Sequence, residues 1–444
     1  MTEIAPEIIT ALMIGGILTG ILLGYPLAIA VGGTGVIAGL ILFGYNITLE
    51  LSYARFFSLL NNYVLLAVPL FIFMGTMLEH SRIADGMFSA LHIWLGKFRG
   101  GLAVATVIIG ALVAACVGVI AASVTLLTLI ALPSMINRGY DKSLATGAVC
   151  GGGSLGILIP PSVMLVIYGP MASISVGKLF FAAFPAGFAL AALYCIYIVV
   201  RCLLQPEIAP PVAPEEIRIP FMQKTRMLIT AIVPTVVLIL AVMGSIFLGI
   251  ASPTEAAGVG CLAAILLAVG YRKFNVELLK KTAMTTVRIT GMGLLIGAMA
   301  SIFVGTFMRA GCDEVIHEFI MGMPGGRWGS FATIMFITFI LGFFIDWIGI
   351  LFIMVPIITP IGAALGFDPL WFGMMICINL QMSFMTPPFA YALFFLKGAV
   401  DPSLGVTTAD IIRGIIPYVC IILLFLILCI AFPDIILWLP GKML

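Results

Sequence analysis

The chain has 444 residues, of which 62% are hydrophobic and only 9% charged, and its mean hydropathy is +1.25. This composition excludes a soluble protein, and the formal net charge of +2 excludes polyanion binding, and so nucleic acid, as its main function. The nine cysteines and three histidines are scattered without metal-ligand spacing, which argues against a metal centre or a histidine-based catalytic site.

Apolar segments long enough to cross a bilayer recur along the whole chain. In the first half, the predicted spans are about 8–27, 28–45, 56–79, 102–135 and 179–202. The fourth is too long for one straight crossing, and Gly118 and Ser123-Val124-Thr125 near its middle predict an unwound break. The amphipathic piece before it, 82–99, predicts a helix lying along the membrane surface.

A glycine- and proline-rich motif follows the fourth span, deep in apolar sequence. It reads Gly151-Gly152-Gly153-Ser154-Leu155-Gly156-Ile157-Leu158-Ile159-Pro160-Pro161-Ser162. Glycine is unfavourable inside helices and proline removes a backbone donor, while irregular backbone at membrane depth requires cover from protein or water. We therefore expect the tip of a re-entrant hairpin here. The incidental GxGxxG spacing does not indicate a dinucleotide site, because no βαβ pattern surrounds it.

The middle of the chain contains a linker and two further spans. From Gln205 to Arg226 the sequence is polar, proline-rich and basic, which indicates the cytoplasmic side. Spans at about 227–250 and 254–271 lead out and back to a second basic patch. Between them, Ser252-Pro253-Thr254-Glu255 is typical of a helix start, so we expect Glu255 to cap a helix rather than to bind an ion.

The second half repeats the plan of the first. It consists of a span at 284–308, a surface arm at 309–327, a long apolar run at 331–364, a second Pro-Pro motif and a last span at 411–437. The long run is expected to break near Asp346-Trp347-Ile348-Gly349. The second motif, Gln381-Met382-Ser383-Phe384-Met385-Thr386-Pro387-Pro388-Phe389, lies 227 residues after the first. Two copies of such a unit are typical of a secondary transporter with its site at the repeat interface.

The first arm is net basic and the second net acidic, so we expect them on opposite faces of the membrane and the repeats to be inverted. The predicted fold is an all-α polytopic membrane protein with about eleven transmembrane helices plus two re-entrant hairpins. The N-terminus is expected in the periplasm and the C-terminus in the cytoplasm. The predicted units are N-terminal scaffold helices (1–55), repeat 1 (56–204), the linker with central scaffold helices (205–283) and repeat 2 (284–444).

The ends of broken helices predict the site. Carbonyls at such ends can coordinate Na⁺, and N-terminal amides attract an anion. The predicted sodium ligands, mostly through backbone carbonyls, are Gly118, Ser123, Thr125, Gly152, Asp346, Gly349 and Met385. The predicted substrate-binding residues are Gly153, Ser154, Gln381, Ser383 and Thr386. The hydroxyls could instead only satisfy freed backbone groups, and the Asp346 carboxylate could be a structural anchor rather than an ion ligand.

Three stretches together resemble the large membrane (M) subunit of tripartite ATP-independent periplasmic (TRAP) transporters. They are 152–162, Pro253-Thr254-Glu255-Ala256-Ala257 and 383–394, and the resemblance spans most of the chain. It implies an elevator-type symporter of the ion transporter superfamily in the bacterial inner membrane, importing a small organic acid anion with Na⁺. It also implies two partners, a small four-helix membrane subunit of the Q type and a periplasmic substrate-binding protein.

One departure from the family concerns the first break. Many members carry a serine-rich stretch there, whereas this chain reads Cys116-Val117-Gly118-Val119-Ile120-Ala121-Ala122-Ser123, which shifts the expected ligation toward backbone carbonyls. The alternative function is a stand-alone Na⁺- or H⁺-coupled dicarboxylate symporter that needs no binding protein. A channel is a third hypothesis. An intramembrane enzyme is not expected, because no histidine cluster, Ser-Lys pair or carboxylate pair lies at membrane depth.

Overall fold

The computed structural model describes residues 4–212, 219–388 and 390–443, and every regular element among them is helical. The α-helices are α1 (Pro6–Leu22), α2 (Leu27–Leu60), α3 (Ala67–His80), α4 (Ile83–Leu95), α5 (Gly101–Val117), α6 (Ile120–Ile136), α7 (Lys142–Ser154), α8 (Val163–Ala172), α9 (Val176–Leu204), α10 (Phe221–Phe247), α11 (Pro253–Gly270), α12 (Val276–Arg309), α13 (Cys312–Met321), α14 (Gly326–Leu341), α15 (Trp347–Ala364), α16 (Pro369–Met385), α17 (Tyr391–Ala399), α18 (Thr408–Ala431) and α19 (Asp434–Leu437). Within these ranges, eight helices, counting α3 with the short turn before it, are long and apolar enough to cross a membrane. The all-α membrane class is confirmed.

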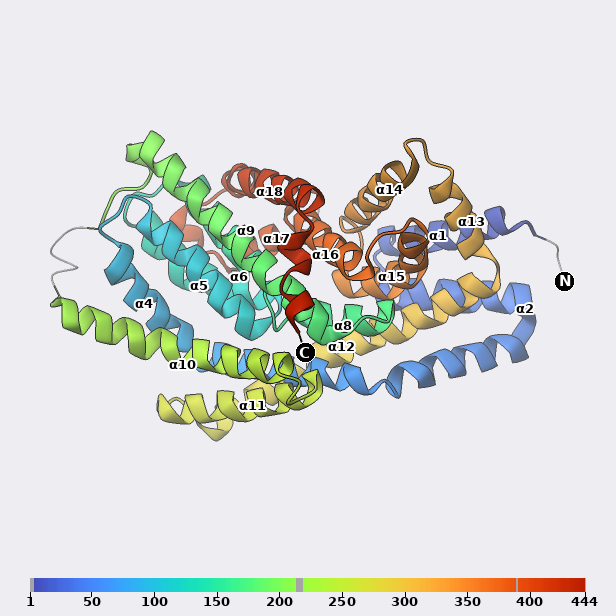
Figure 1. Ribbon diagram of the computed structural model, residues 1–444, viewed down its shortest axis with the longest axis horizontal. Helices are drawn as coiled ribbons and strands as arrows, with labels where there is room; N and C mark the ends of the chain where they lie inside the picture. The colour runs from blue at the N-terminus through green and yellow to red at the C-terminus, as the bar shows by residue number, and fades with distance from the viewer. Residues whose placement is uncertain (1–3, 213–218, 389, 444) are drawn as a thin grey trace.

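The order of elements occurs twice. A long helix (α3 or α12) leads to an amphipathic arm (α4 or α13), then to two helix pairs (α5–α6 and α7–α8, or α14–α15 and α16–α17) and a last long helix (α9 or α18). Each arm begins after a residue in the left-handed region, Arg82 with φ 54° and Gly311 with φ 72°. The two arms lie at opposite ends of the molecule, α4 at the left and α13 at the right of Figure 1.

The first pair of each copy is a re-entrant hairpin. The start of α5 lies against the end of α6, where the Leu102 amide donates to the Tyr140 hydroxyl at 3.4 Å and Thr106 Oγ1 contacts Met135 Sδ at 3.9 Å. In the second copy, Trp328 and Phe331 at the start of α14 contact the Phe367 ring just after α15, with centroid distances of 5.4 and 5.3 Å. The tips are therefore the breaks at 118–119 and 342–346.

The second pair of each copy crosses the protein instead of turning back. Helix α7 starts beside Arg201 at the end of α9, and α8 leads into the start of α9, at the other end of that helix. Likewise, Trp371 Nε1 at the start of α16 donates to the Cys429 carbonyl at the end of α18, at 3.0 Å. The chain after α17 reaches the start of α18, where Lys142 Nζ donates to the Gly405 carbonyl at 2.6 Å.

The location predicted for the hairpins is therefore wrong, although their number is right. The Pro-Pro motifs break two crossing helices, and the long apolar runs form the hairpins. Helix length explains why the long runs, and not the Pro-Pro segments, turn back. Helices α5 and α6 have 17 residues each and would together measure about 50 Å if they were collinear, which is too long for a hydrocarbon core of about 30 Å. The 13 and 10 residues of α7 and α8 together measure only about 35 Å, which suits a single crossing.

The remaining helices form a layer beside these pairs. Helix α2 is interrupted at Gly44, with φ 79° and ψ 177°, and its two halves fold back so that Gly39 faces Thr48. Small residues let α2 approach α12 closely: a Cβ on Gly35 would lie 2.7 Å from the backbone of Phe303. At the start of α11, Ser252 and Glu255 form a reciprocal capping box, so the expected capping role of Glu255 is confirmed.

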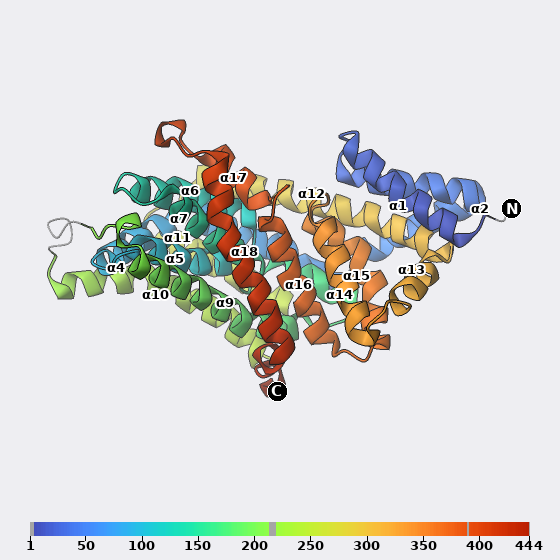
Figure 2. The same ribbon diagram turned by 90° about the horizontal axis from the view of Figure 1, so that it is seen from above.

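The described C-terminal residues lie far from the linker. Met443 packs beside Gly177 at the start of α9, whereas the linker follows the other end of α9 at Leu204. Figure 2 shows α18 running from its start near α17 to the C-terminus. The 29 residues of α9 place the linker and the C-terminus about 44 Å apart along this helix. The sequence predicted that both are cytoplasmic, and this separation shows that they cannot both be. A cytoplasmic linker places the C-terminus on the periplasmic side.

Candidate substrate and ion site

The tip of hairpin 1 is seated on the break of the first crossing helix. Gly118 has φ 64°, and a Cβ there would lie 3.2 Å from both the Pro161 carbonyl oxygen and the Val163 nitrogen. From the other side, a Cβ on Gly156 would lie 3.3 Å from Ser123 Oγ, which itself donates to the Val119 carbonyl at 3.2 Å. Two predicted sodium ligands, Gly118 and Ser123, thus meet the first Pro-Pro motif.

The tip of hairpin 2 is seated in the same way on the second crossing helix. Ser383 Oγ donates to the Phe339 carbonyl in the last turn of α14 at 2.8 Å, and the missing side chain of Gly342 leaves room for it. One turn earlier in α16, Asn379 Nδ2 donates to the Met335 carbonyl at 2.7 Å and to Thr338 Oγ1 at 3.1 Å. Hydrogen bonds therefore hold hairpin 2 where backbone packing holds hairpin 1.

The two crossing helices meet at a pair of predicted substrate-binding residues. Gln381 Nε2 donates to Ser154 Oγ at 3.3 Å, and both side chains are fully buried. These residues are separated by the same 227 positions as the Pro-Pro pairs. Equivalent residues of two repeats come into contact at an axis that relates the repeats. Gln381 Oε1 has no hydrogen-bond partner among the described residues, so this junction retains a spare acceptor oxygen.

The glycines of the first motif have a packing role. A Cβ on Gly152 would lie 3.1 Å from Val107 Cα in α5, and one on Gly153 would lie 2.5 Å from Val124 Cγ2 in α6. In return, a Cβ on Gly110 would lie 2.6 Å from the carbonyl carbon and oxygen of Gly152. Helix α7 is therefore held in backbone contact with both helices of hairpin 1.

The remaining predicted site residues, Thr125, Gly349, Met385 and Thr386, lie at separate places around the two breaks. Thr125 is half-buried in α6 and is rotated about 200° from Ser123, since successive helical residues are about 100° apart. Gly349 lies in the first turn of α15, just after the second tip, against Leu27 at the start of α2. Met385 is buried at the end of α16, where the Thr386 hydroxyl donates to the Met382 carbonyl at 2.8 Å. The structure therefore brings Gly349 to the edge of the layer formed by α2 and α12.

A cavity of about 470 Å³ separates the hairpin tips from α2, α3 and α12. Its lining is mostly apolar, and Asp346 is the one charged side chain among the described residues that line it. Four helices begin at this cavity, and none of these starts has a side-chain cap. The residues at these starts that line it are Val119–Ala121, Val163, Asp346–Ile348 and Tyr391. Uncapped amides at helix starts favour an anion in the cavity, whereas the Asp346 carboxylate at one of these starts opposes it.

Several residues of the site were not predicted from the sequence. Ser162 is fully buried and donates to the Ile157 carbonyl at 2.6 Å, which holds the break of the first crossing helix. Its place directly after Pro160-Pro161 was a usable signal, because a hydroxyl beside a helix break often satisfies freed backbone groups. Phe384 and Tyr391 also line the cavity, and their place in the stretch 383–394, which carries the family resemblance, was a usable signal.

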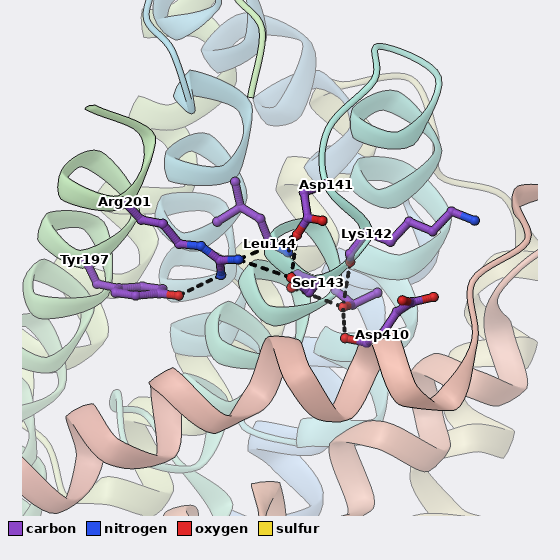
Figure 3. A network of polar contacts seen from close by, with 8 residues as sticks. Asp141, Lys142, Ser143, Leu144, Tyr197, Arg201 and Asp410 are labelled. Atoms are coloured by element: carbon purple, nitrogen blue, oxygen red, sulfur yellow. Dashed lines mark hydrogen bonds and ion pairs between the residues drawn. The ribbon is translucent and has the colours of Figure 1, made fainter. Parts of the chain in front are cut away.

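A polar network holds the start of the first crossing helix (Figure 3). Arg201 of α9 lies 3.7 Å from the Asp141 carboxylate and donates to Ser143 Oγ at 3.3 Å and to the Tyr197 hydroxyl at 2.8 Å. Asp141 also caps α7 by accepting from the Leu144 amide at 2.9 Å. The Asp410 carbonyl of α18 accepts a hydrogen bond from the Thr146 hydroxyl of α7, at 3.4 Å. Helices α7, α9 and α18 are thereby fixed to one another at one end.

Comparisons with known proteins place the chain in a family. Residues 14–435 match the family model described as tripartite ATP-independent periplasmic transporter, DctM component. The C4-dicarboxylate TRAP transporter large permease protein DctM of Pseudomonas aeruginosa is 30% identical over 390 residues, 87% of this chain and 88% of that protein. The ectoine TRAP transporter large permease protein TeaC of Halomonas elongata is 27% identical over 97% of this chain and 98% of that protein. The sialic acid TRAP transporter large permease protein SiaM of Vibrio cholerae is 28% identical over 87% and 88%.

One solved structure shows the same fold. The crystal structure of the YdaH transporter of Alcanivorax borkumensis matches with a TM-score of 0.64 and 14% sequence identity, over 97% of this chain and 99% of that one. The predicted resemblance is confirmed by the family match, and the named relatives are transporter permeases rather than enzymes. The chain belongs to the DctM family, the large permease components of TRAP transporters, and is a multi-pass protein of the bacterial inner membrane.

Proposed function

We propose that this chain imports a small organic acid anion together with Na⁺, after delivery of the substrate by a periplasmic binding protein and in complex with a small four-helix membrane subunit. Family membership supports transport, and the relatives are named for C4-dicarboxylates, ectoine and sialic acid. The observation that carries the proposal is the seating of two hairpin tips on two broken helices, which meet at Ser154 and Gln381.

The donor atoms at the first tip suit sodium. The hydroxyls of Ser123 and Ser162 and the carbonyls of Val119, Ile157 and Pro161 surround the contact between tip and break. All of these are neutral oxygens, the ligand type that a hard monovalent cation prefers, and the backbone here departs from the helical pattern. A bound cation would supply positive charge there, while this chain's residues hold tip and break together. Gly118 and Ser123 remain the strongest candidates, and Gly152 the weaker, because it packs against α5.

The larger cavity suits the anion. Its four uncapped helix starts attract a carboxylate, whereas Asp346 repels one unless it is protonated or paired with a cation. This opposition supports coupling, because the anion is then best accommodated when a positive charge accompanies it. Each net positive charge that moves inward gains about 2.3 kcal/mol per 100 mV of membrane potential.

We further propose an elevator movement between inverted repeats. The hairpins, crossing helices, α9 and α18 would form the moving domain, and α1, α2, α3, α10, α11 and α12 the scaffold, with α4 and α13 as connecting arms. Three features support this division. The arms lie at opposite ends of the molecule, equivalent residues meet at the centre, and the cavity lies where the tips face the scaffold.

The test is uptake in proteoliposomes that contain this chain and its small subunit, with radiolabelled organic acids and an inward Na⁺ gradient, with and without the binding protein. The proposal requires uptake that depends on both Na⁺ and the binding protein. Equal uptake without the binding protein would identify a stand-alone symporter. Uptake driven by a pH gradient and indifferent to Na⁺ would replace sodium coupling with proton coupling through Asp346.

A further inference from the structure

A polar hollow lies far from the transport site, between the first arm and two scaffold helices. It has a volume of about 450 Å³ and is formed by the start of α4, the second and third turns of α10 and the chain just after α11. The Tyr271 hydroxyl donates to the Thr230 carbonyl and closes one wall. A side chain on Gly86 would meet nothing within 4 Å, so the missing side chain of this glycine helps to open the hollow.

The charges in the hollow favour an anion. Arg82 and Lys273 line it, and no salt bridge to either is found among the described residues. Asp85 is the one acidic side chain among the described residues that line it, so cations outnumber acidic groups there two to one. The hydroxyls of Ser81, Ser89 and Thr230 already donate to backbone carbonyls, so the two cations provide the donors that an anion needs. Two cations around an open space suit a phosphate group better than a carboxylate, because a phosphate has more acceptor oxygens to share between them.

Apolar surface continues from this hollow along the membrane-spanning parts of both scaffold helices. On α10, the exposed Ile229, Val233 and Val237 lie at four-residue spacing. Ile229 is about 200° around the helix from Met227, and the stripe reaches the side of Thr230, which lines the hollow, at Val237. On α11, the exposed Leu262, Leu266 and Val269 follow the same kind of stripe toward Lys273. A molecule with a phosphate head and long apolar chains would cover both the polar hollow and these stripes.

We propose that this hollow binds the headgroup of an anionic phospholipid of the cytoplasmic leaflet, with its phosphodiester between Arg82 and Lys273 and its acyl chains along α10 and α11. The side of the membrane follows from the basic residues that flank the linker and the end of α11. Bound there, the lipid connects the arm that carries hairpin 1 to the scaffold. Membrane composition then acts on α4, the arm that leads to hairpin 1, rather than on the transport site.

The test is thermal unfolding of the purified full chain in neutral detergent, titrated with palmitoyl-oleoyl phosphatidylglycerol or with phosphatidylcholine. We expect phosphatidylglycerol to raise the midpoint by roughly 2–4 °C and phosphatidylcholine to raise it less. In the Arg82→Gln/Lys273→Gln double variant, the lipid concentration for half of this rise should increase about 10- to 30-fold. Asp85→Asn should lower that concentration. The control, Lys97→Gln/Lys280→Gln, removes two exposed charges outside the hollow and should respond like the unmodified chain.

A second variant separates binding from charge. Gly86→Leu fills the hollow, keeps every charge and has space to fold, and it should weaken the response to phosphatidylglycerol as the double variant does. Identical responses of both variants and the unmodified chain would overturn the proposal, as would identical responses to the two lipids. If 10 mM glycerol 3-phosphate raised the midpoint and the same variants abolished that rise, the site would serve a soluble phosphate and the lipid assignment would be wrong.

Discussion

Gly118 offers the most direct test of how the first hairpin tip is seated. The residue has φ 64°, and a Cβ at this position would lie 3.2 Å from the Pro161 oxygen and the Val163 nitrogen. Gly118→Ala therefore has two costs. The left-handed backbone disfavours any side chain by about 1–2 kcal/mol, and the contact with backbone atoms adds about 1–3 kcal/mol because neither partner can rotate away.

The second cost can be measured alone with a matched control. Gly311 also has a left-handed backbone, φ 72°, but a Cβ there would meet nothing within 4 Å. Gly311→Ala thus carries the strain without the contact. If the seated tip is the Na⁺-binding conformation, the additional 1–3 kcal/mol lowers its population and raises the Na⁺ concentration for half-maximal uptake roughly 5- to 140-fold.

The assay is initial uptake in proteoliposomes over a series of Na⁺ concentrations, with the thermal midpoint of each variant measured in parallel. We expect both variants to lose some stability and only Gly118→Ala to lose apparent Na⁺ affinity. Equal Na⁺ dependence in Gly118→Ala and Gly311→Ala would refute the reasoning, because it would mean that the contact between tip and break does not control ion binding.

Three further variants test the packing of the hairpins, the crossing helices and α18. Gly110→Ala would push α5 away from α7 and should lower the thermal midpoint by several degrees, whereas Gly258→Ala in α11, with nothing within 4 Å, should be neutral or stabilising; equal midpoints would contradict the backbone contact. Ser383→Ala removes the 2.8 Å hydrogen bond to the Phe339 carbonyl and should weaken the docking of hairpin 2 by about 1 kcal/mol, which we expect to see as weaker substrate uptake at limiting Na⁺. Unchanged uptake would mean that other contacts hold hairpin 2 in place. Thr407→Ala breaks the capping box with Asp410 at the start of α18 and should cost about 1 kcal/mol in stability without changing Na⁺ dependence.

The repeat could be recognised from the sequence because its markers are local. Two Pro-Pro pairs, flanked by glycine or hydroxyl residues, stand at a constant offset, and both long apolar runs contain a break where one was predicted. Glycine and proline favour such breaks through their own backbone preferences, so the breaks leave a local trace in the sequence. The capping role of Glu255 was predictable for the same reason, since the box involves four consecutive residues.

The assignment of hairpins and crossing helices was wrong because it rested on the same local markers. A break looks alike in sequence whether the chain turns back or continues beyond it. The helix lengths on either side contained the answer, since 17 and 17 residues exceed one crossing while 13 and 10 match it. The glycines of the first motif also have a packing role that the sequence analysis did not predict, since they bring the crossing helix into close contact with hairpin 1.

The sequence by itself determined the membrane class, the duplicated plan, the positions of the breaks and the family. These depend on hydropathy, on backbone preferences and on motifs, all of which are properties of short segments. Only the tertiary structure decided which broken segment turns back, that Ser154 and Gln381 meet, and that Arg82 and Lys273 share a hollow. These contacts join residues 227 and 191 positions apart, and no local preference specifies them, because they arise only when packed helices bring distant turns together.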